Sequence, residues 1–228
     1  MKTFAIIPAG GKGSRSGHTT PKQYLKFNNK ELIAYTLEIF QRNKLINDIV
    51  IAADPHYFNL LEKIKKKYNL NKISGIVESG RERQHSVFNA VKSLYARKND
   101  LVVVHDAARP LLQDKILTKA IRLAKTRGNA LVCLKAKDTL IRGNEYVKNY
   151  LNRDEVYYVQ TPQIFTYADL MEAMQYAKKR NFVGTDESIL VKKYGKKVHI
   201  LEGSSINFKI TSKSDVELFK MISKNGLN

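Results

Sequence analysis

Apolar runs alternate with segments of helical periodicity along most of this chain. Continuous apolar runs rich in β-branched residues are typical of strands buried on both faces of a parallel sheet, and they occur at Thr3–Ile7, Asp48–Ala52, Ile73–Val77, Leu101–Val104 and Ala130–Leu134. Apolar positions three and four apart predict intervening helices at Glu31–Asn43, Tyr57–Tyr68, Ser86–Arg97 and Asp114–Thr126. This order predicts an α/β fold, with a Rossmann-like, open, mostly parallel sheet and helices on both faces.

The pattern changes between Asp138 and Gln163, where short strands are only half apolar. These strands are expected at Asp138–Arg142, Tyr146–Leu151 and Glu155–Gln160, with a turn at Gly143-Asn144. They predict a projecting β-arm over residues 138–163 that can pack on another subunit. Ordinary edge strands are the alternative. Helices are expected to resume at Tyr167–Arg180, Asp186–Tyr194 and Ser214–Ser223, with strands at Val198–Glu202 and near Asn207–Thr211. We therefore predict a single domain over residues 1–228 that contains the arm.

Composition narrows the class of protein. The chain has 228 residues, of which 43% are hydrophobic, and no apolar run approaches the length that spans a membrane. Its start is strand-like and lacks the pattern of a secretory signal. The single cysteine, Cys133, excludes an internal disulfide framework and lies in an apolar run, where a buried thiol is expected. The cytoplasm is the expected location.

The formal net charge is +19. Nucleic acid, anionic membrane or phosphorylated small molecules can each favour such a charge. The basic residues are spread in small groups, and no zinc finger, RNP-type aromatic strand or arginine-rich tract occurs. This favours a solvated basic surface, with neither nucleic acid nor membrane as a partner. A basic nucleic-acid-binding module remains the alternative from a different class.

A glycine-rich turn follows the first predicted strand. It carries Gly10, Gly11 and Gly13, with Arg15 close behind and Lys22 after Pro21. Glycines let several backbone N–H groups approach a ligand, and the cations can neutralise phosphate charge. The spacing matches neither a P-loop nor the complete dinucleotide fingerprint. The turn predicts a phosphate site, and a plain strand-to-helix turn is the alternative.

Further candidates follow later strands. Asp106 comes two residues after the end of the strand Leu101–Val104, at the sheet edge where the glycine turn is expected. Its carboxylate can therefore hold Mg²⁺ that bridges substrate phosphates. A capping role is the alternative. Arg109 is expected to pair with phosphate or to lock its loop, and His105 to be structural. Ser86 can reach a base or sugar, or simply cap its helix.

The order of the short motifs resembles the 2-C-methyl-D-erythritol 4-phosphate cytidylyltransferase family over nearly the whole chain. The motifs are Pro8-Ala9-Gly10-Gly11-x-Gly13-x-Arg15, Pro21-Lys22-Gln23-Tyr24-Leu25, Gly80-x-x-Arg83-x-x-Ser86-Val87, Val104-His105-Asp106-Ala107-Ala108-Arg109-Pro110, Asp138-Thr139, Gln160-Thr161-Pro162-Gln163, Thr185-Asp186 and Asn207-x-Lys209-Ile210-Thr211. Two positions depart from the family pattern: Gly10 replaces the usual second alanine of the loop, and Ser16 replaces a methionine.

The resemblance implies a role for each matching position. CTP would be held by a nucleotide-binding set, Ala9, Gly10, Gly11, Gly80, Ser86 and Ala107. The catalytic cations would be Arg15, Lys22 and Lys209, and Asp106 would hold Mg²⁺. The polyol phosphate would be bound by Arg109, Thr139, Arg153, Thr161 and Thr185. In the family, Thr139 and Arg153 would reach the site from the arm of a second subunit, which implies a homodimer.

The implied reaction moves CMP from CTP to 2-C-methyl-D-erythritol 4-phosphate, in isoprenoid biosynthesis. The substrate phosphate is already a nucleophile at neutral pH, which agrees with the lack of a Ser-His-Asp or cysteine nucleophile pattern. A ribitol-5-phosphate cytidylyltransferase is the alternative within the class. That group tends to carry another small residue at the position of Ala108, so Ala108 favours methylerythritol phosphate.

Overall fold

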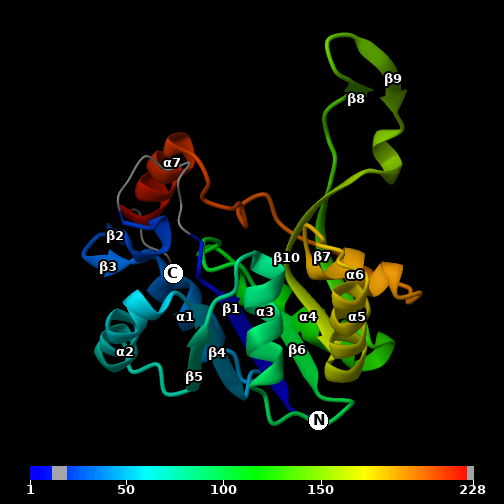
Figure 1. Cartoon of the computed structure of the whole chain (residues 1–228). Helices are drawn as coiled ribbons and strands as arrows, with labels where there is room; N and C mark the ends of the chain where they lie inside the picture. The colour runs from blue at the N-terminus through cyan, green and yellow to red at the C-terminus, as the bar shows by residue number, and fades with distance from the viewer. Residues whose placement is uncertain (12–19, 225–228) are drawn as a thin grey trace.

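A computed structural model describes residues 1–11 and 20–224 of the chain. The predicted catalytic Arg15 lies outside these residues. Seven strands form the central sheet, in the order β11-β7-β10-β6-β1-β4-β5 (Figure 1). Their bounds are β1 Thr3–Pro8, β4 Asp48–Ala53, β5 Ile73–Glu78, β6 Leu101–Val104, β7 Asn129–Lys135, β10 Tyr157–Thr166 and β11 Ile200–Glu202. The mostly parallel α/β sheet that the sequence predicts is thereby confirmed.

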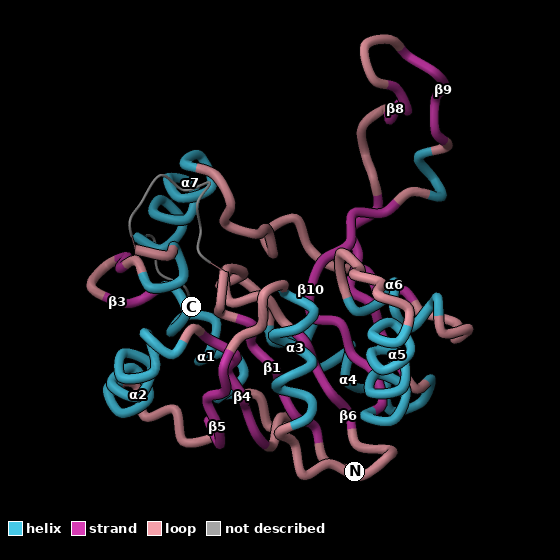
Figure 2. The backbone as a smooth tube through the Cα atoms, in the orientation of Figure 1, coloured by secondary structure: helices cyan, strands magenta, loops and turns pink. Residues whose placement is uncertain are grey.

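Helices cover both faces of the sheet (Figures 1 and 2). The helices are α1 Leu32–Arg42, α2 Phe58–Lys67, α3 Arg83–Lys92, α4 Asp114–Arg127, α5 Tyr167–Lys179, α6 Glu187–Lys193 and α7 Lys213–Lys224. The alternation of side chains along β1 explains the layers. Ala5 and Ile7 face a core built with α1, α2 and α4, whereas Phe4 and Ile6 face one built with α3, α5 and α6. Among the described residues, none of the helices has the length and apolar character needed to cross a membrane.

The strand β10 is the main departure from the predicted topology. It pairs antiparallel with both β6 and β7, in the middle of the sheet. The sequence predicts only its first part, as a strand of the arm, because its later part carries polar residues. Gln160, Thr161 and Gln163 are nevertheless buried. A buried strand can carry such side chains only when other groups satisfy their hydrogen bonds.

Two smaller expectations are also corrected. The helix predicted at Ser86–Arg97 starts earlier and ends earlier, as α3. No strand forms at Asn207–Thr211 in the described structure. Instead Asn207 is buried and its side-chain amide donates to the Thr161 carbonyl oxygen at 2.8 Å, which fixes this segment without a ladder.

A two-stranded hairpin stands apart from the sheet. β8 Leu140–Gly143 pairs antiparallel with β9 Val147–Leu151. Figure 2 shows the pair joined to the sheet by an extended loop on one side and through the short helix η4 (Arg153–Glu155) on the other. Large apolar side chains are exposed on it, including Ile141, Tyr146 and Tyr150. The last residues of the predicted arm, Tyr157–Gln163, instead pair with β7 in the central sheet. The role of the hairpin in dimerisation stays a prediction.

Candidate active site

The predicted phosphate and metal positions lie at one edge of the sheet. β1, β4 and β5 run parallel, as do β1 and β6. The residues that follow β1, β5 and β6 are the glycine turn, Ser79-Gly80 and His105–Pro110, so all three segments lie at the carboxyl ends of their strands. Ligands of open α/β sheets bind at this edge.

The two side chains that follow Lys22 hold the start of the glycine turn in place. The Gln23 amide donates to the Ala9 and Gly11 carbonyl oxygens at 2.7 and 2.9 Å, and the Tyr24 hydroxyl donates to the Ala9 oxygen at 3.2 Å. Both side chains are buried. Lys22 directly precedes these two anchors, at the start of the short helix η2 (Lys22–Tyr24), and is half-buried. The motif that carries Lys22 therefore also fixes the loop on which phosphate is expected to bind.

Close backbone approach explains two of the predicted nucleotide-binding glycines. A Cβ on Gly80 would lie 2.3 Å from the Cβ of His85, and a Cβ on Gly10 would lie 2.3 Å from the Cβ of Ser79. Neither position can carry a side chain without a backbone shift. Next to them, the Ser86 hydroxyl accepts from the Gly80 N–H at 3.0 Å and donates to the Glu82 carbonyl at 3.1 Å. Ser86 thus joins the first turn of α3 to the Gly80 turn, without acting as the helix cap that was the alternative.

Asp106 lies at the centre of a cationic cluster. Its Oδ1 accepts from Arg83 Nε at 2.9 Å, and its Oδ2 lies 3.0 Å from Lys209 Nζ and 3.5 Å from Arg109 Nε. Burial alone would raise the pKa of this carboxyl, but the charges of Arg83, Lys209 and Arg109 outweigh it and hold the pKa well below its usual range. Asp106 is therefore ionised and surrounded by cations.

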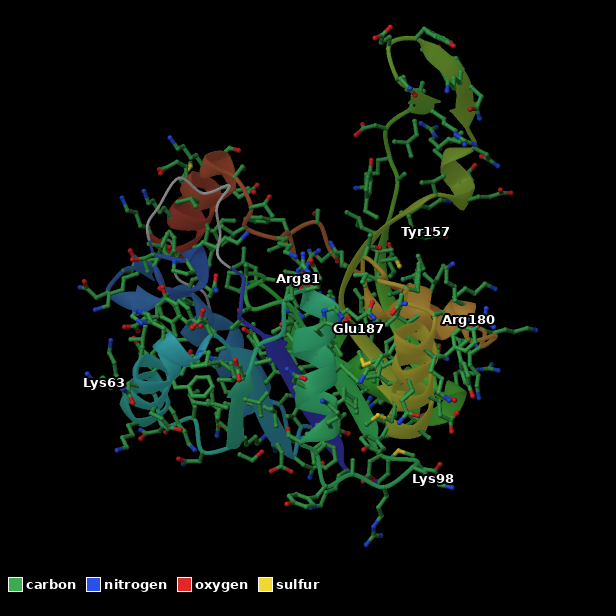
Figure 3. The ribbon with its side chains drawn as sticks, in the orientation of Figure 1. Lys63, Arg81, Lys98, Tyr157, Arg180 and Glu187 are labelled. Carbon is green, nitrogen blue, oxygen red and sulfur yellow. The ribbon has the colours of Figure 1, made fainter. Side chains whose placement is uncertain are left out.

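Arg83 joins this cluster to a second buried carboxylate that the sequence analysis missed. Its Nη1 donates to both carboxylate oxygens of Glu187, at 2.7 and 2.8 Å, and Glu187 is fully buried. Burial would lower the pKa of Arg83, yet the two carboxylates raise it. Figure 3 shows Glu187 in the interior and Arg81 at the edge above α3. No sequence pattern links Arg83 and Glu187, because 104 positions separate them.

His105 and Thr161 form the support beneath Asp106. The Thr161 hydroxyl accepts from the Asp106 N–H and also contacts His105 Nδ1, both at 3.1 Å. The other ring nitrogen of His105 lies 3.1 Å from the Arg109 carbonyl oxygen. Burial lowers the pKa of His105 to about 4, so the ring is neutral at pH 7. His105 is structural, as expected, and Thr161 positions the Asp106 backbone.

Contacts to the same loop bring Lys209 to the site. The Ile210 N–H donates to the Ala108 carbonyl at 2.9 Å. Arg109 Nη1 donates to the Asn207 carbonyl at 2.7 Å, so Arg109 locks the loop, one of its two predicted roles. Ala107 is buried, and its carbonyl accepts from the Thr36 hydroxyl at 2.9 Å. These contacts fix the backbone on both sides of Lys209.

Three predicted substrate-binding residues are not drawn into this cluster. Thr139, Arg153 and Thr185 are exposed. Arg153 Nη1 donates to the Lys137 carbonyl at 3.2 Å, next to the hairpin, and Thr185 directly precedes Asp186, which caps α6. The substrate-binding roles that the resemblance implies for these three residues stay predictions.

The donor set of the site fits a divalent cation that arrives with phosphate. Within residues 1–11 and 20–224, no three His, Cys, Asp or Glu side chains gather as a metal cage. Magnesium usually binds through one or two carboxylates and completes its shell with substrate phosphates and water. Asp106, ionised and at the strand end, is suited to provide that single carboxylate.

Comparison with known proteins agrees with this geometry. Residues 3–225 match the family profile described as IspD, 2-C-methyl-D-erythritol 4-phosphate cytidylyltransferase. A relative of that name from Clostridium botulinum is 37% identical over 97% of each chain. Another, from Lysinibacillus sphaericus, is 35% identical over 95% of this chain and 93% of the relative.

Solved structures point the same way. The 4-diphosphocytidyl-2C-methyl-D-erythritol synthase of Anaerococcus prevotii superposes with a TM-score of 0.86 at 26% identity, covering 98% of this chain and 96% of its own. The Francisella tularensis 2-C-methyl-D-erythritol 4-phosphate cytidylyltransferase gives 0.83 at 31% identity, covering 97% and 99%. The chain belongs to the 2-C-methyl-D-erythritol 4-phosphate cytidylyltransferase family.

Proposed function

We propose that this chain transfers CMP from CTP to 2-C-methyl-D-erythritol 4-phosphate and releases pyrophosphate, a step of isoprenoid biosynthesis. Membership of the family supports the reaction. The structural observation that carries it is the cluster of Arg83, Arg109 and Lys209 around Asp106, at the same sheet edge as the glycine turn. Two polyanions must meet in this reaction, so fixed positive charge is the main requirement of the site.

The chemistry needs positioning and charge neutralisation. A phosphate oxygen of the polyol phosphate attacks the α-phosphorus of CTP in line with the departing pyrophosphate. Lys22 and Lys209, with Arg15, neutralise the negative charge that gathers at the α-phosphate. A dedicated general base is unnecessary because the attacking phosphate is already ionised. One well-placed donor is typically worth about 10²–10³ in rate, or roughly 3–4 kcal/mol.

The nucleotide is assigned to the turn between β1 and η2 and to the turn after β5. Backbone groups of Ala9, Gly10 and Gly11 would cradle CTP, and the Gln23 contacts that fix this turn support the assignment. Gly80, Ser86 and Ala107 would complete the cradle. A cavity of about 250 Å³ opens beside the turn, lined partly by Gly10, Gly11 and His56.

Asp106 is the residue assigned to Mg²⁺. When bound, the cation would neutralise part of the triphosphate charge and polarise the α-phosphate. In the structure Lys209 Nζ lies 3.0 Å from Asp106 Oδ2, and the Lys209 side chain is 38% exposed. This exposure supports an exchange in which Lys209 turns toward the triphosphate.

The polyol phosphate would lie between Arg109, Thr161 and Thr185 of one subunit and Thr139 and Arg153 of the other. A homodimer built through residues 138–163 is therefore part of the proposal. The exposed apolar side chains of the β8–β9 hairpin support it, because a partner surface would remove them from water. The cytoplasm is the proposed location, which agrees with a single cysteine that forms no disulfide.

Pyrophosphate release with CTP and a panel of polyol phosphates tests the function. We expect turnover with 2-C-methyl-D-erythritol 4-phosphate and far slower turnover with ribitol 5-phosphate. A preference for ribitol 5-phosphate would reassign the substrate while keeping cytidylyl transfer. No release with any polyol phosphate, in the presence of magnesium, would overturn the function.

A further inference from the structure

Ser79 occupies a central place in the proposed nucleotide site, although no motif of the sequence marks it. It directly follows β5, and its N–H donates to the Ala53 carbonyl at 2.8 Å. On the other side of β4, the Ala9 N–H donates to the Ala52 carbonyl at 2.7 Å. Ser79 and the start of the glycine turn are therefore fastened to successive residues of one strand. They face each other across its end.

The Ser79 side chain fills the space above Gly10. A Cβ on Gly10 would lie 2.3 Å from Ser79 Cβ and 2.4 Å from Ser79 Oγ. Rotation of the serine cannot relieve the first contact, because a Cβ moves only with its backbone. The alanine that is usual in the family at this position is thus incompatible with Ser79 in the present backbone. With Ser79 in this position, residue 10 must be a glycine.

Of the two nearby serine hydroxyls, that of Ser79 is available to bond a ligand. The nearby Ser86 hydroxyl is engaged with the Gly80 N–H and the Glu82 carbonyl. Within residues 1–11 and 20–224 no hydrogen bond of the Ser79 side chain is found, and the residue is only half-buried. A hydroxyl both donates and accepts, so it can bond either a carbonyl or an amino group of a nucleoside.

We propose that Ser79 binds the nucleoside part of CTP through its hydroxyl and that Gly10 is required in this chain to make room for it. The inference rests on the proposed function only in taking the ligand to be a cytidine nucleotide. It assigns a contact to a residue outside the family motifs. It also explains why Gly10 stands where the family usually has an alanine.

Calorimetric titration with CTP alone tests the contact. Ser79→Ala keeps the Cβ and removes one oxygen, so folding is not at stake. A net hydrogen bond of about 0.5–1.5 kcal/mol predicts a Kd for CTP that rises roughly 2- to 12-fold. The KM for the polyol phosphate should stay unchanged. Ser74→Ala, on the exposed part of β5, is the matched control and should bind CTP like the wild type. A wild-type Kd in Ser79→Ala would overturn the contact.

A double-mutant cycle tests the steric pairing. Gly10→Ala should weaken CTP binding by more than Ser79→Ala does, and adding Ser79→Gly should restore much of that loss. Thermal melting checks that each variant folds, and a melting temperature lowered by Gly10→Ala and restored in the double variant would support the pairing by itself. Equal CTP binding and melting temperature in Gly10→Ala and wild type would overturn it. Because CTP binding needs no second substrate, failure of turnover would refute the proposed function and leave this result intact.

Discussion

Removal of the Arg83 side chain should destabilise the protein and misplace Asp106. Arg83→Met leaves two buried carboxylates, Asp106 and Glu187, without the cation that they share at 2.7–2.9 Å. Breaking a buried pair by removing one partner typically costs about 3–5 kcal/mol. We expect the lower end, about 3 kcal/mol, because 26% of the Arg83 side chain is exposed and Lys209 still neutralises Asp106.

The loss should also depend on pH. Burial raises the pKa of Glu187, and Arg83 opposes this rise. Without Arg83, the folded state binds a proton at Glu187 over a pH range in which the unfolded state has released it. Stability then falls as pH rises. Arg83→Met should therefore be least destabilised near pH 5 and more so near pH 8.

Urea unfolding at several pH values measures both effects. The matched control is Arg81→Met, an exposed neighbour on the same turn, which should change stability by less than about 0.5 kcal/mol. The double variant Arg83→Met/Glu187→Met should recover most of the stability, since apolar replacement of a buried pair is often neutral. Its turnover should stay about 10- to 100-fold low, because Asp106 Oδ1 has lost its donor. A loss under about 1 kcal/mol, or one independent of pH, would refute the reasoning.

Four further predictions concern other parts of the chain. Lys22→Ala should lower kcat for CMP transfer by about 10²–10³ with an unchanged circular dichroism spectrum, and wild-type turnover would contradict its role. Arg153→Lys should raise the KM for the polyol phosphate far more than that for CTP, since lysine lacks the bidentate fork. Hybrid dimers refolded from Arg153→Ala and Lys22→Ala subunits should recover activity that neither parent shows, and absence of rescue in demonstrated hybrids would confine Arg153 to its own subunit. Cys133 should resist thiol reagents at pH 8 until urea is added, because burial raises its pKa to about 11, and rapid labelling of the native protein would contradict this.

The sheet was predictable because its signal is local. β1, β4 and β6 are short continuous apolar runs, and turn residues follow them. β10 was found only in part, because Gln160, Thr161 and Gln163 interrupt its apolar pattern. Distant segments supply partners for most of these polar groups: the Gln160 amide donates to the Ser204 carbonyl, and the Gln163 side-chain oxygen accepts from the Ser188 N–H. The Gln163 side-chain nitrogen has no hydrogen-bond partner among the described residues. Hydropathy along one segment does not contain that information.

The candidate site likewise contains residues that the sequence predicts and residues that it does not. The glycine turn and Asp106 were predictable because both closely follow apolar strands. The part played by Glu187 was not, since an acidic residue after Asp186 reads as helix capping. Its partner Arg83 lies on another helix. Lys209 was expected on a strand. Its position is instead fixed by the hydrogen bond from the Asn207 side chain to Thr161 and by one backbone hydrogen bond at Ile210. Only tertiary packing creates such contacts.

The three cations around Asp106 differ in how many other segments of the protein they contact. Arg83 is committed to Glu187, and Arg109 donates to the Asn207 carbonyl, so each arginine holds two segments together. Lys209 contacts only the Asp106 carboxylate among the described residues, and it is the most exposed of the three, at 38% against 26% and 11%. A lysine ammonium on a flexible stem can move to a new anion with little loss elsewhere, whereas moving either arginine would release a helix or a loop. This difference in attachment supports the proposal that Lys209 stabilises transition-state charge, and it gives Arg83 and Arg109 a structural part in the site as well.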